Sequence, residues 1–244
     1  MFNYVGPAKP LEEVSSRTLE TGRFYKIDDQ WMPSITTVVG NQSKHGILKW
    51  QQRVGFAEAE KVRRAAAWRG TQYHNLVEKY LKNELEEVEK SEGLPTYLFR
   101  SARETLNRIS NIHAIEAPLF SRTLGVAGRV DCIAEFDNEL AIIDFKTTKN
   151  LKKEEHLEKF FVQEAAYAYM YYELTGVEVD KLVTLSVAED GSMQVAEKYD
   201  KDTYIDTLIE WIRQYHNEKA VACQGGYHQS TKEVQKIVGW FVRS

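Results

Sequence analysis

Two aspartates and a lysine stand near the ends of two apolar segments in the middle of the chain. Asp131 lies in AGRVDCIAEF, and Asp144 precedes Lys146 in AIIDFKTTKN. Alternate residues of a strand share one face, so Asp144 and Lys146 lie on one side of a strand that is apolar on both faces until its end. Taken alone, an acid and a lysine in this pattern most often form a structural ion pair.

The turn between these segments decides whether the two aspartates meet. Asp137-Asn138 is a typical turn pair. A two-residue turn there, or a four-residue turn around it, carries the strand register on to Asp131 opposite Asp144, with Cβ atoms about 4.5–5.5 Å apart. Facing carboxylates repel, so the pair persists if one acid is protonated or if a cation lies between them. A turn of odd length would remove this facing.

The two acids and the residues that follow them favour metal-dependent chemistry on a phosphate. Carboxylate oxygens with open coordination positions suit Mg²⁺ or Mn²⁺. After Lys146, the residues Thr147, Thr148 and Lys149 supply hydroxyl, amide and ammonium donors for phosphate groups. A metal would lower the pKa of water and neutralise the developing charge, while Lys146 would orient or activate the water or hold the phosphate. The segment therefore predicts hydrolysis of a phosphodiester.

Five short motifs, in this order, resemble the PD-(D/E)XK nuclease superfamily in its RecB-like exonuclease branch. They are RGTQYH at 69–74, IEAPLFS at 115–121, GRVD at 128–131, DFK at 144–146 and QEAAY at 163–167. PSITTVV at 33–39, followed by LKW at 48–50, is similar to the mitochondrial genome maintenance exonucleases and their phage relatives. The chain departs from the branch in lacking a proline before Asp131, and its second acid is Asp rather than Glu, which the branch permits.

The resemblance implies a role for each matching residue. The implied catalytic residues and metal ligands are His74, Asp131, Asp144, Phe145 through its carbonyl, Lys146, Gln163 and Tyr167. It implies Mg²⁺ or Mn²⁺ as the cofactor. It implies no iron–sulfur cluster, because the cysteines of the cluster-containing members are missing.

Several of these residues have structural explanations as well. Without the resemblance, His74 fits a histidine at the edge of the core more often than a ligand. Gln163 and Tyr167 lie one helical turn apart and fit ordinary packing. Glu116 either supplies a further acid near the metal or pairs with Arg129, and the sequence leaves that choice open.

Candidate DNA contacts concentrate in the N-terminal half, although the net charge is −4. Residues 41–70 hold seven Lys and Arg against two Glu, which fits either a polyanion-binding surface or a solvated helix face. The candidate substrate-binding residues are Ser34, Thr36, Thr37, Arg69, Thr147, Thr148 and Lys149. The first three would otherwise cap a helix. Trp31, Trp50 and Trp68 either stack on bases or pack in the core, with packing favoured for at least two of them.

The order of elements predicts an α/β fold with a restriction-endonuclease-like core, in which a small mixed central sheet is flanked by helices. The expected elements are a hairpin and loop at 23–39, helices at 46–90 with breaks near Gly55 and Gly70, a helix at 95–112, strands at 117–123, 127–136 and 139–146, a helix at 154–174 ending at Gly176, strands at 181–188 and 193–199, and a helix at 202–219. We expect one nuclease domain over 1–244. A mainly helical N-terminal part (1–113) would cover the site of the core (114–220), and 221–244 would form a tail.

Composition bounds the function further. The chain of 244 residues has no apolar run long enough to span a membrane and no signal pattern, so we expect a cytoplasmic protein of a bacterium or phage-infected host cell. Its two cysteines are too few for a disulfide framework, and Cys132 is expected in the core.

The combined prediction is a Mg²⁺- or Mn²⁺-dependent exodeoxyribonuclease acting on single-stranded DNA or single-stranded ends in replication, recombination or repair. A structure-specific endonuclease, a catalytically silent DNA-binding protein and a small-molecule phosphohydrolase are the alternatives, and the oligomeric state stays open.

Overall fold

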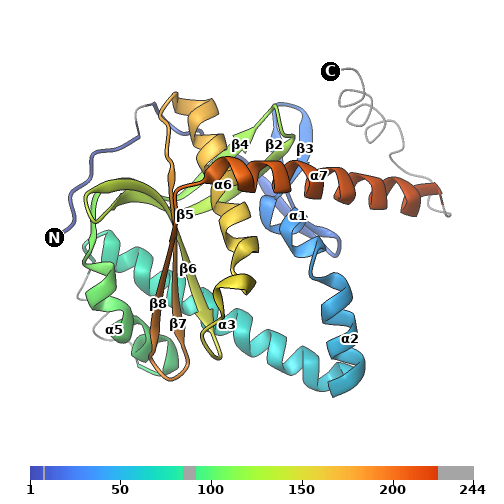
Figure 1. Ribbon diagram of the computed structural model, residues 1–244, viewed down its shortest axis with the longest axis horizontal. Coiled ribbons are helices and arrows are strands. Elements are labelled where there is room, and N and C mark those ends of the chain that lie inside the picture. Colours follow the sequence, from blue (N-terminus) through green and yellow to red (C-terminus); the bar gives the residue numbers. More distant parts are fainter. Residues whose placement is uncertain (8, 85–91, 225–244) are drawn as a thin grey trace.

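The computed structural model describes residues 1–7, 9–84 and 92–224, and its centre is a five-stranded sheet (Figure 1). In spatial order the strands are β4 (Ile109–Ser121), β5 (Val126–Phe136), β6 (Glu139–Thr148), β7 (Lys181–Ala188) and β8 (Met193–Lys198). β6 and β7 pair in parallel and the other neighbours pair antiparallel. The expected α/β fold with a small mixed sheet is confirmed.

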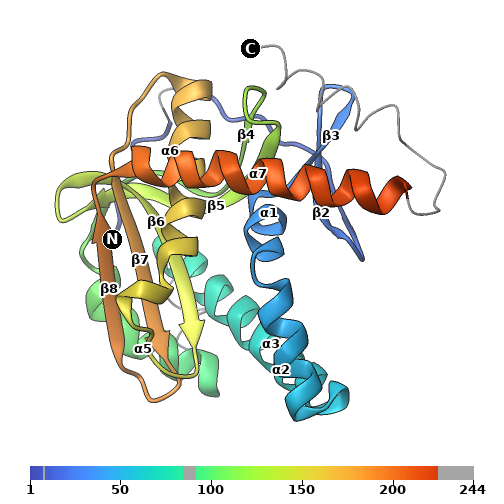
Figure 2. The ribbon, with the colours of Figure 1, turned by 45° about the vertical axis from the view of Figure 1, so that its right-hand side comes forward.

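Helices cover both faces of this sheet (Figure 2). One face carries α1 (Ile35–Asn41), α6 (Glu158–Thr175) and α7 (Lys201–Gln224), and the other carries α3 (Phe56–Leu81) and α5 (Leu94–Leu106). In β6, Ile142 belongs to the core on the α6 side and Ile143 to the core on the α3 side, and both are fully buried. β6 is therefore the doubly covered central strand that its apolar sequence predicts.

The β5–β6 hairpin has the predicted register. Asp137 and Asn138 form its two-residue turn with φ values of 54° and 63°, the left-handed conformation that a type I′ turn requires at both positions. The cross-strand pairs run from Phe136–Glu139 through Glu135–Leu140, Ala134–Ala141 and Ile133–Ile142 to Cys132–Ile143. Continued by one residue, this register sets Asp131 opposite Asp144. Cys132 is buried, as expected.

The long helix α3 differs from the prediction at one of its two glycines. The predicted break at Gly55 is confirmed, because α2 (Lys44–Val54) ends there and α3 begins at the next residue. The predicted break at Gly70 is wrong, since α3 passes through it. A Cβ at Gly70 would lie 3.8 Å from Oγ1 of Thr147, an ordinary van der Waals distance, so the fold has no steric need for glycine here. A glycine inside a helix costs only about 1 kcal/mol relative to alanine, and the packing of α3 on α5 and β6 carries the helix through it.

The boundary between α5 and β4 is the other wrong prediction. The helix expected to reach 112 ends at Leu106, and β4 begins at Ile109. β4 is irregular: its pairing with β5 shifts register between Ser110 and Ala114, and Asn111 has a φ of 42°. A strand with such interruptions does not show the alternation of polar and apolar residues that marks a strand in sequence.

The N-terminal part contains a second sheet as well as helices. Its antiparallel strands are β1 (Ser16–Leu19), β2 (Gly22–Ile27) and β3 (Gln30–Pro33), of which β2 and β3 form the predicted hairpin. The predicted helix at 154–174 starts with a short 3-10 turn, η1 (Glu154–His156), and α6 then ends at Gly176 as predicted. The end of the helix expected at 46–90 and most of the tail at 221–244 fall outside the described residues. Within the part that is described, no helix is long and apolar enough to cross a membrane.

Candidate active site

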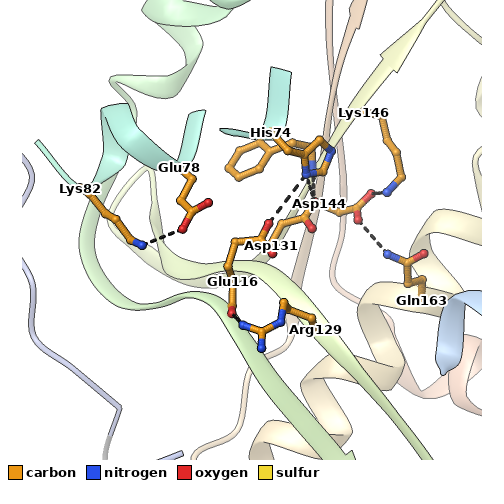
Figure 3. Close-up of polar contacts among 10 residues, drawn as sticks. His74, Glu78, Lys82, Glu116, Arg129, Asp131, Asp144, Lys146 and Gln163 are labelled. Atoms are coloured by element: carbon orange, nitrogen blue, oxygen red, sulfur yellow. Dashed lines mark hydrogen bonds and ion pairs between the residues drawn. The ribbon is translucent and has the colours of Figure 1, made fainter. Parts of the chain in front are cut away.

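Three carboxylates line up across the neighbouring strands β4, β5 and β6 (Figure 3). The pairs on either side of Glu116 place it opposite Asp131, and the β5–β6 register places Asp131 opposite Asp144. The main-chain amide of Phe145 donates a hydrogen bond to Oδ2 of Asp131 at 2.9 Å. The sheet thus brings together three acids that are far apart in the chain; we call Glu116, Asp131 and Asp144 the acid row.

His74 of α3 faces this row, as Figure 3 shows. Its Nδ1 lies 3.6 Å from Oδ2 of Asp131 and 3.9 Å from Oε1 of Glu116. Burial lowers the pKa of His74, but the charge of Asp131 and the hydrogen bond with Glu116 outweigh it and raise the pKa to about 9. The negative field that holds a proton on this imidazole is also one that attracts a cation.

The donor set of this cluster fits a divalent metal ion. One ligand atom each from His74, Glu116 and Asp131 lie within 4.8 Å of one another. Two carboxylates and an imidazole, open on the remaining sides, suit Mn²⁺ well and Mg²⁺ through the carboxylates. The grouping includes Glu116, which the resemblance did not assign, and it joins residues from α3, β4 and β5.

Asp144 is buried and both of its oxygens contact other side chains. Nζ of Lys146 lies 2.5 Å from its Oδ2, and Nε2 of Gln163 donates to its Oδ1 at 2.8 Å. Burial raises the pKa of Asp144 to about 6, although the charge of Lys146 opposes the rise. Burial lowers the pKa of Lys146, but the charges of Asp144 and Asp131 raise it overall. Asp144 thus joins the acid row to the predicted lysine and glutamine.

Tyr167 lies in the core behind the row rather than in an open site. It is buried, and burial raises the pKa of its hydroxyl well above the ordinary value. A Cβ at Gly128 of β5 would lie 2.7 Å from Cε1 of Tyr167 and 3.0 Å from Cγ2 of Ile35. Gly128 therefore lets α6 and α1 pack directly on the strand that carries Asp131.

Ser34, Thr36 and Thr37 form a hydrogen-bonded group at the start of α1. Oγ of Ser34 accepts from the amide of Thr37 at 3.1 Å and lies 2.8 Å from the hydroxyls of both threonines. The amide of Arg23 donates to the Thr37 hydroxyl at 2.9 Å. Among the described residues, the three make no hydrogen bond with the acid row, and helix capping accounts for their contacts.

The remaining candidate substrate contacts lie at the end of β6. Arg69 of α3 is buried, forms an ion pair with Glu189 and donates from Nε to the Thr147 hydroxyl at 3.4 Å. It ties α3 to the ends of β6 and β7. Thr148 donates to the carbonyl two residues further on at 2.8 Å, and Lys149 is exposed. Of this group, Lys149 is the residue most open to a ligand.

Two acids near the site go beyond the predicted residues. The Glu116 carboxylate faces His74, whereas Arg129 donates to the main-chain carbonyl of Glu116 and forms its ion pair with Glu13. Glu164 of α6 is fully buried and accepts a hydrogen bond from the Thr184 hydroxyl. Burial raises the pKa of Glu164 well above its ordinary value, and the charge of the acid row adds to the rise. Counting register back from the β4–β5 turn would have found Glu116, whereas no sequence pattern marks Glu164.

An α/β fold with two acids and a lysine at the ends of paired central strands defines a class of nuclease. The profile of the PD-(D/E)XK nuclease superfamily matches residues 45–232, and the chain belongs to this superfamily. The resemblance drawn from the five motifs is confirmed.

Individual relatives are named as exonucleases. Mitochondrial genome maintenance exonuclease 1 of Mus musculus is 24% identical over 163 residues, which cover 62% of this chain and 46% of that protein. The same protein of Homo sapiens is 27% identical over 133 residues, covering 50% of this chain and 38% of that one. The chain thus spans less than half the length of these relatives. A crystal structure of a presumed exonuclease from Eubacterium rectale aligns with a TM-score of 0.39 and 12% identity, covering 60% of this chain and 64% of that chain.

Proposed function

We propose that the protein is a Mg²⁺- or Mn²⁺-dependent deoxyribonuclease that works as an exonuclease on single-stranded DNA or single-stranded ends in replication, recombination or repair. The observation that carries the proposal is the convergence of Glu116, Asp131 and Asp144 with His74 and Lys146 in one site. Superfamily membership supports hydrolysis of a phosphodiester, and the exonuclease relatives support action from a strand end.

Each residue of the site has a proposed part in the reaction. The metal would be held by His74, Glu116 and Asp131, with Asp144 and the Phe145 carbonyl as the further ligands that the resemblance implies. A bound divalent cation supplies a water of lowered pKa and neutralises charge on the phosphate.

Two other side chains complete this arrangement. Lys146 places an ammonium beside Asp144, where it binds a phosphate oxygen and stabilises the charge that develops there. Gln163 holds the Asp144 carboxylate in orientation through its 2.8 Å hydrogen bond. Tyr167 would support the site indirectly, by packing in the core against β5, the strand that carries Asp131.

A projecting helical arm supplies a surface for the DNA strand. The arm, residues 44–68, comprises α2 and the first half of α3, which extend together from the body of the molecule (Figures 1 and 2). Its exposed cations without an ion pair to any described residue are Lys44, Lys49, Arg53 and Lys61. Phe56 and Trp68 are 62% and 60% exposed. Cations for phosphates beside aromatic faces for bases are typical of single-strand binding.

The three tryptophans differ in how far they are exposed. Trp68 lies on the exposed surface of the arm, and Trp31 and Trp50 are partly buried. Arg17 lies over the Trp31 ring at 3.9 Å, which gives that side chain a structural partner. Trp68 is therefore the tryptophan that we propose as a stacking platform for a base.

Digestion of end-labelled single- and double-stranded oligonucleotides tests the reaction. We expect shortening of the single strand with Mg²⁺ or Mn²⁺, none in EDTA, and recovery when the metal is restored. DNA binding without cleavage under any metal would overturn the proposal in favour of a silent DNA-binding protein. RNA strands and free nucleotides, assayed in parallel, define the substrate class.

Closed single-stranded circles separate the two enzyme alternatives. An exonuclease leaves a covalently closed circle intact and degrades the same DNA after one nick. A structure-specific endonuclease of the same superfamily opens the circle or cuts at a branch point. Degradation of the intact circle would therefore replace the exonuclease proposal with an endonuclease.

A further inference from the structure

Three lysines surround one phenylalanine ring beside the candidate active site. The Nζ atoms of Lys152, Lys146 and Lys159 lie 4.5, 5.3 and 5.4 Å from the centroid of the Phe160 ring. Lys146 comes from β6, Lys152 from the link that follows it, and Lys159 and Phe160 from the first turn of α6. The ring carries no net charge, so contact with it leaves three ammonium groups close together without neutralising them.

The positions of Lys152 and Lys159 are electrostatically unfavourable in the absence of a ligand. Burial and the ammonium groups of Lys159 and Lys146 lower the pKa of Lys152, and burial and Lys146 lower the pKa of Lys159. The N-terminus of the 18-residue helix α6 adds the positive end of its dipole to the same place. The cluster therefore costs folding free energy, and a bound anion would recover it.

Nearby acids do not neutralise the cluster. Two of the acids closest in the chain pair with other groups, Glu154 with Lys198 and Glu155 with His156. Glu158 is exposed and forms no ion pair with Lys152 or Lys159 among the described residues. Lys152 and Lys159 make no ion pair with any residue that the structure describes. Lys146 alone is paired, with Asp144. The positive charge of Lys152 and Lys159 is thus left for a ligand from outside the chain.

We propose that Lys146, Lys152 and Lys159 form a subsite for a phosphate group of the substrate strand next to the one that is cleaved. The inference rests on the proposed function and extends it, because Lys146 belongs to both places: it lies 2.5 Å from Asp144 and 5.3 Å from the Phe160 ring. The Phe160 ring lies within 5.4 Å of all three ammonium groups and is the common neighbour of the cluster. The subsite would fix the strand relative to the acid row.

A double substitution with a matched control tests the subsite. Lys152→Gln/Lys159→Gln removes two charges from the cluster, and Lys153→Gln removes one from an exposed neighbour that does not contact the ring. Binding of a fluorescent single-stranded oligonucleotide is measured by anisotropy in EDTA over a salt series. We expect the double variant to bind about tenfold more weakly. The slope of log affinity against log salt should fall in magnitude by about 0.7, the value for the loss of one phosphate contact in a single strand.

Thermal unfolding distinguishes lost binding from lost structure. The double variant should unfold at the same temperature as the wild type or higher, because its substitutions relieve repulsion. Weaker binding together with undiminished stability therefore supports a ligand subsite. An affinity and salt slope equal to those of the wild type, or an equal loss in Lys153→Gln, overturns it.

Modified strands identify which phosphate is bound. Neutral methylphosphonate replaces one phosphate of the strand at a time. At the internal position that the subsite binds, this replacement should weaken binding by the wild type and leave the affinity of the double variant unchanged. If the terminal phosphate is the ligand, its removal should instead weaken binding by the wild type and leave the affinity of the double variant unchanged. Both results support a phosphate ligand and name its source. If the wild type binds and cleaves DNA but methylphosphonate changes the affinity of both proteins equally at every position, the subsite is contradicted and the proposed function stands. If the wild type does not bind DNA at all, the proposed function itself is contradicted.

Discussion

The main-chain amide of Phe145 donates a hydrogen bond to Oδ2 of Asp131 at 2.9 Å, across the β5–β6 hairpin. The same oxygen lies 3.6 Å from Nδ1 of His74. A backbone donor therefore orients this carboxylate, and the position of that donor depends only on how the two strands are paired. The geometry of the candidate metal site follows from strand register more than from side-chain packing.

Replacing either of two site residues should abolish cleavage and leave the fold intact. Asp131→Ala removes a proposed metal ligand, and Lys146→Ala removes the ammonium proposed to stabilise charge on the phosphate. Cleavage of a labelled single strand is measured beside circular dichroism, with Asp202→Asn on the exposed side of α7 as the control. Robust cleavage by either alanine variant would contradict the assignment of the site.

Glu116→Gln should weaken Mn²⁺ binding by about tenfold or more, because it removes one carboxylate ligand while preserving shape. Isothermal titration of Mn²⁺ into the protein measures this affinity. Glu78→Gln is the matched control, since Glu78 lies on the same helix as His74 but pairs with Lys82 at 2.6 Å (Figure 3). An unchanged affinity in Glu116→Gln would place the metal on Asp131 and Asp144 without Glu116.

Gly128→Ala should lower the free energy of unfolding by about 1–3 kcal/mol, as expected for overpacking of a close-packed core. Its Cβ would lie 2.7 Å from Cε1 of Tyr167 and 2.9 Å from Oη. Urea denaturation provides the measurement. Gly40→Ala is the control, because a Cβ there meets nothing within 4 Å and alanine favours a helix. Equal losses in the two variants would show that the contact with Tyr167 is not the cause.

Glu164→Gln should stabilise the protein at neutral pH, by an amount that grows with pH. Burial raises the pKa of Glu164, so the folded state holds a proton that the unfolded state releases above about pH 4.3, the ordinary glutamate value. The wild type therefore loses stability as pH rises from there to the folded pKa, and glutamine, which cannot ionise, does not. Glutamine also keeps an acceptor for the Thr184 hydroxyl.

Urea denaturation of the Glu164→Gln variant and the wild type at pH 5 and pH 8 checks this dependence. Glu158→Gln, an exposed position on the same helix, serves as the control and should show no growth of the difference with pH. A difference between wild type and Glu164→Gln that stays constant from pH 5 to pH 8 would mean that this carboxyl is ionised in the folded state at both values.

What could be predicted from the sequence is what short-range rules determine. The Asp137-Asn138 turn sets the hairpin register, and the register brings Asp131 to Asp144. The end of α6 at Gly176 follows from a left-handed cap, with φ of 80°. These features depend on neighbouring residues, so the printed chain contains all that is needed to infer them.

What could not be predicted depends on contacts between distant segments. The ion pair of Arg69 with Glu189 joins residues 120 positions apart, and nothing in either local sequence marks the partner. Gly70 is read as a helix break because the packing of α3 on α5 and β6, which carries the helix through this residue, is a property of the assembled fold. Glu116 lies one residue before the strand predicted at 117–123 and has a φ of 47°, so its place opposite Asp131 is missed although the register counted from the β4–β5 turn gives it.

The Asp137-Asn138 turn has a consequence for how this gene can change over evolutionary time. Substitutions that tolerate a positive φ leave the acids facing each other, whereas the insertion or deletion of one residue moves Asp131 to the opposite face of the sheet. Such an indel would leave an apolar hairpin able to fold but without its paired acids. The facing of the two acids therefore tolerates changes in the composition of this turn that permit a positive φ, but not a change of its length by one residue.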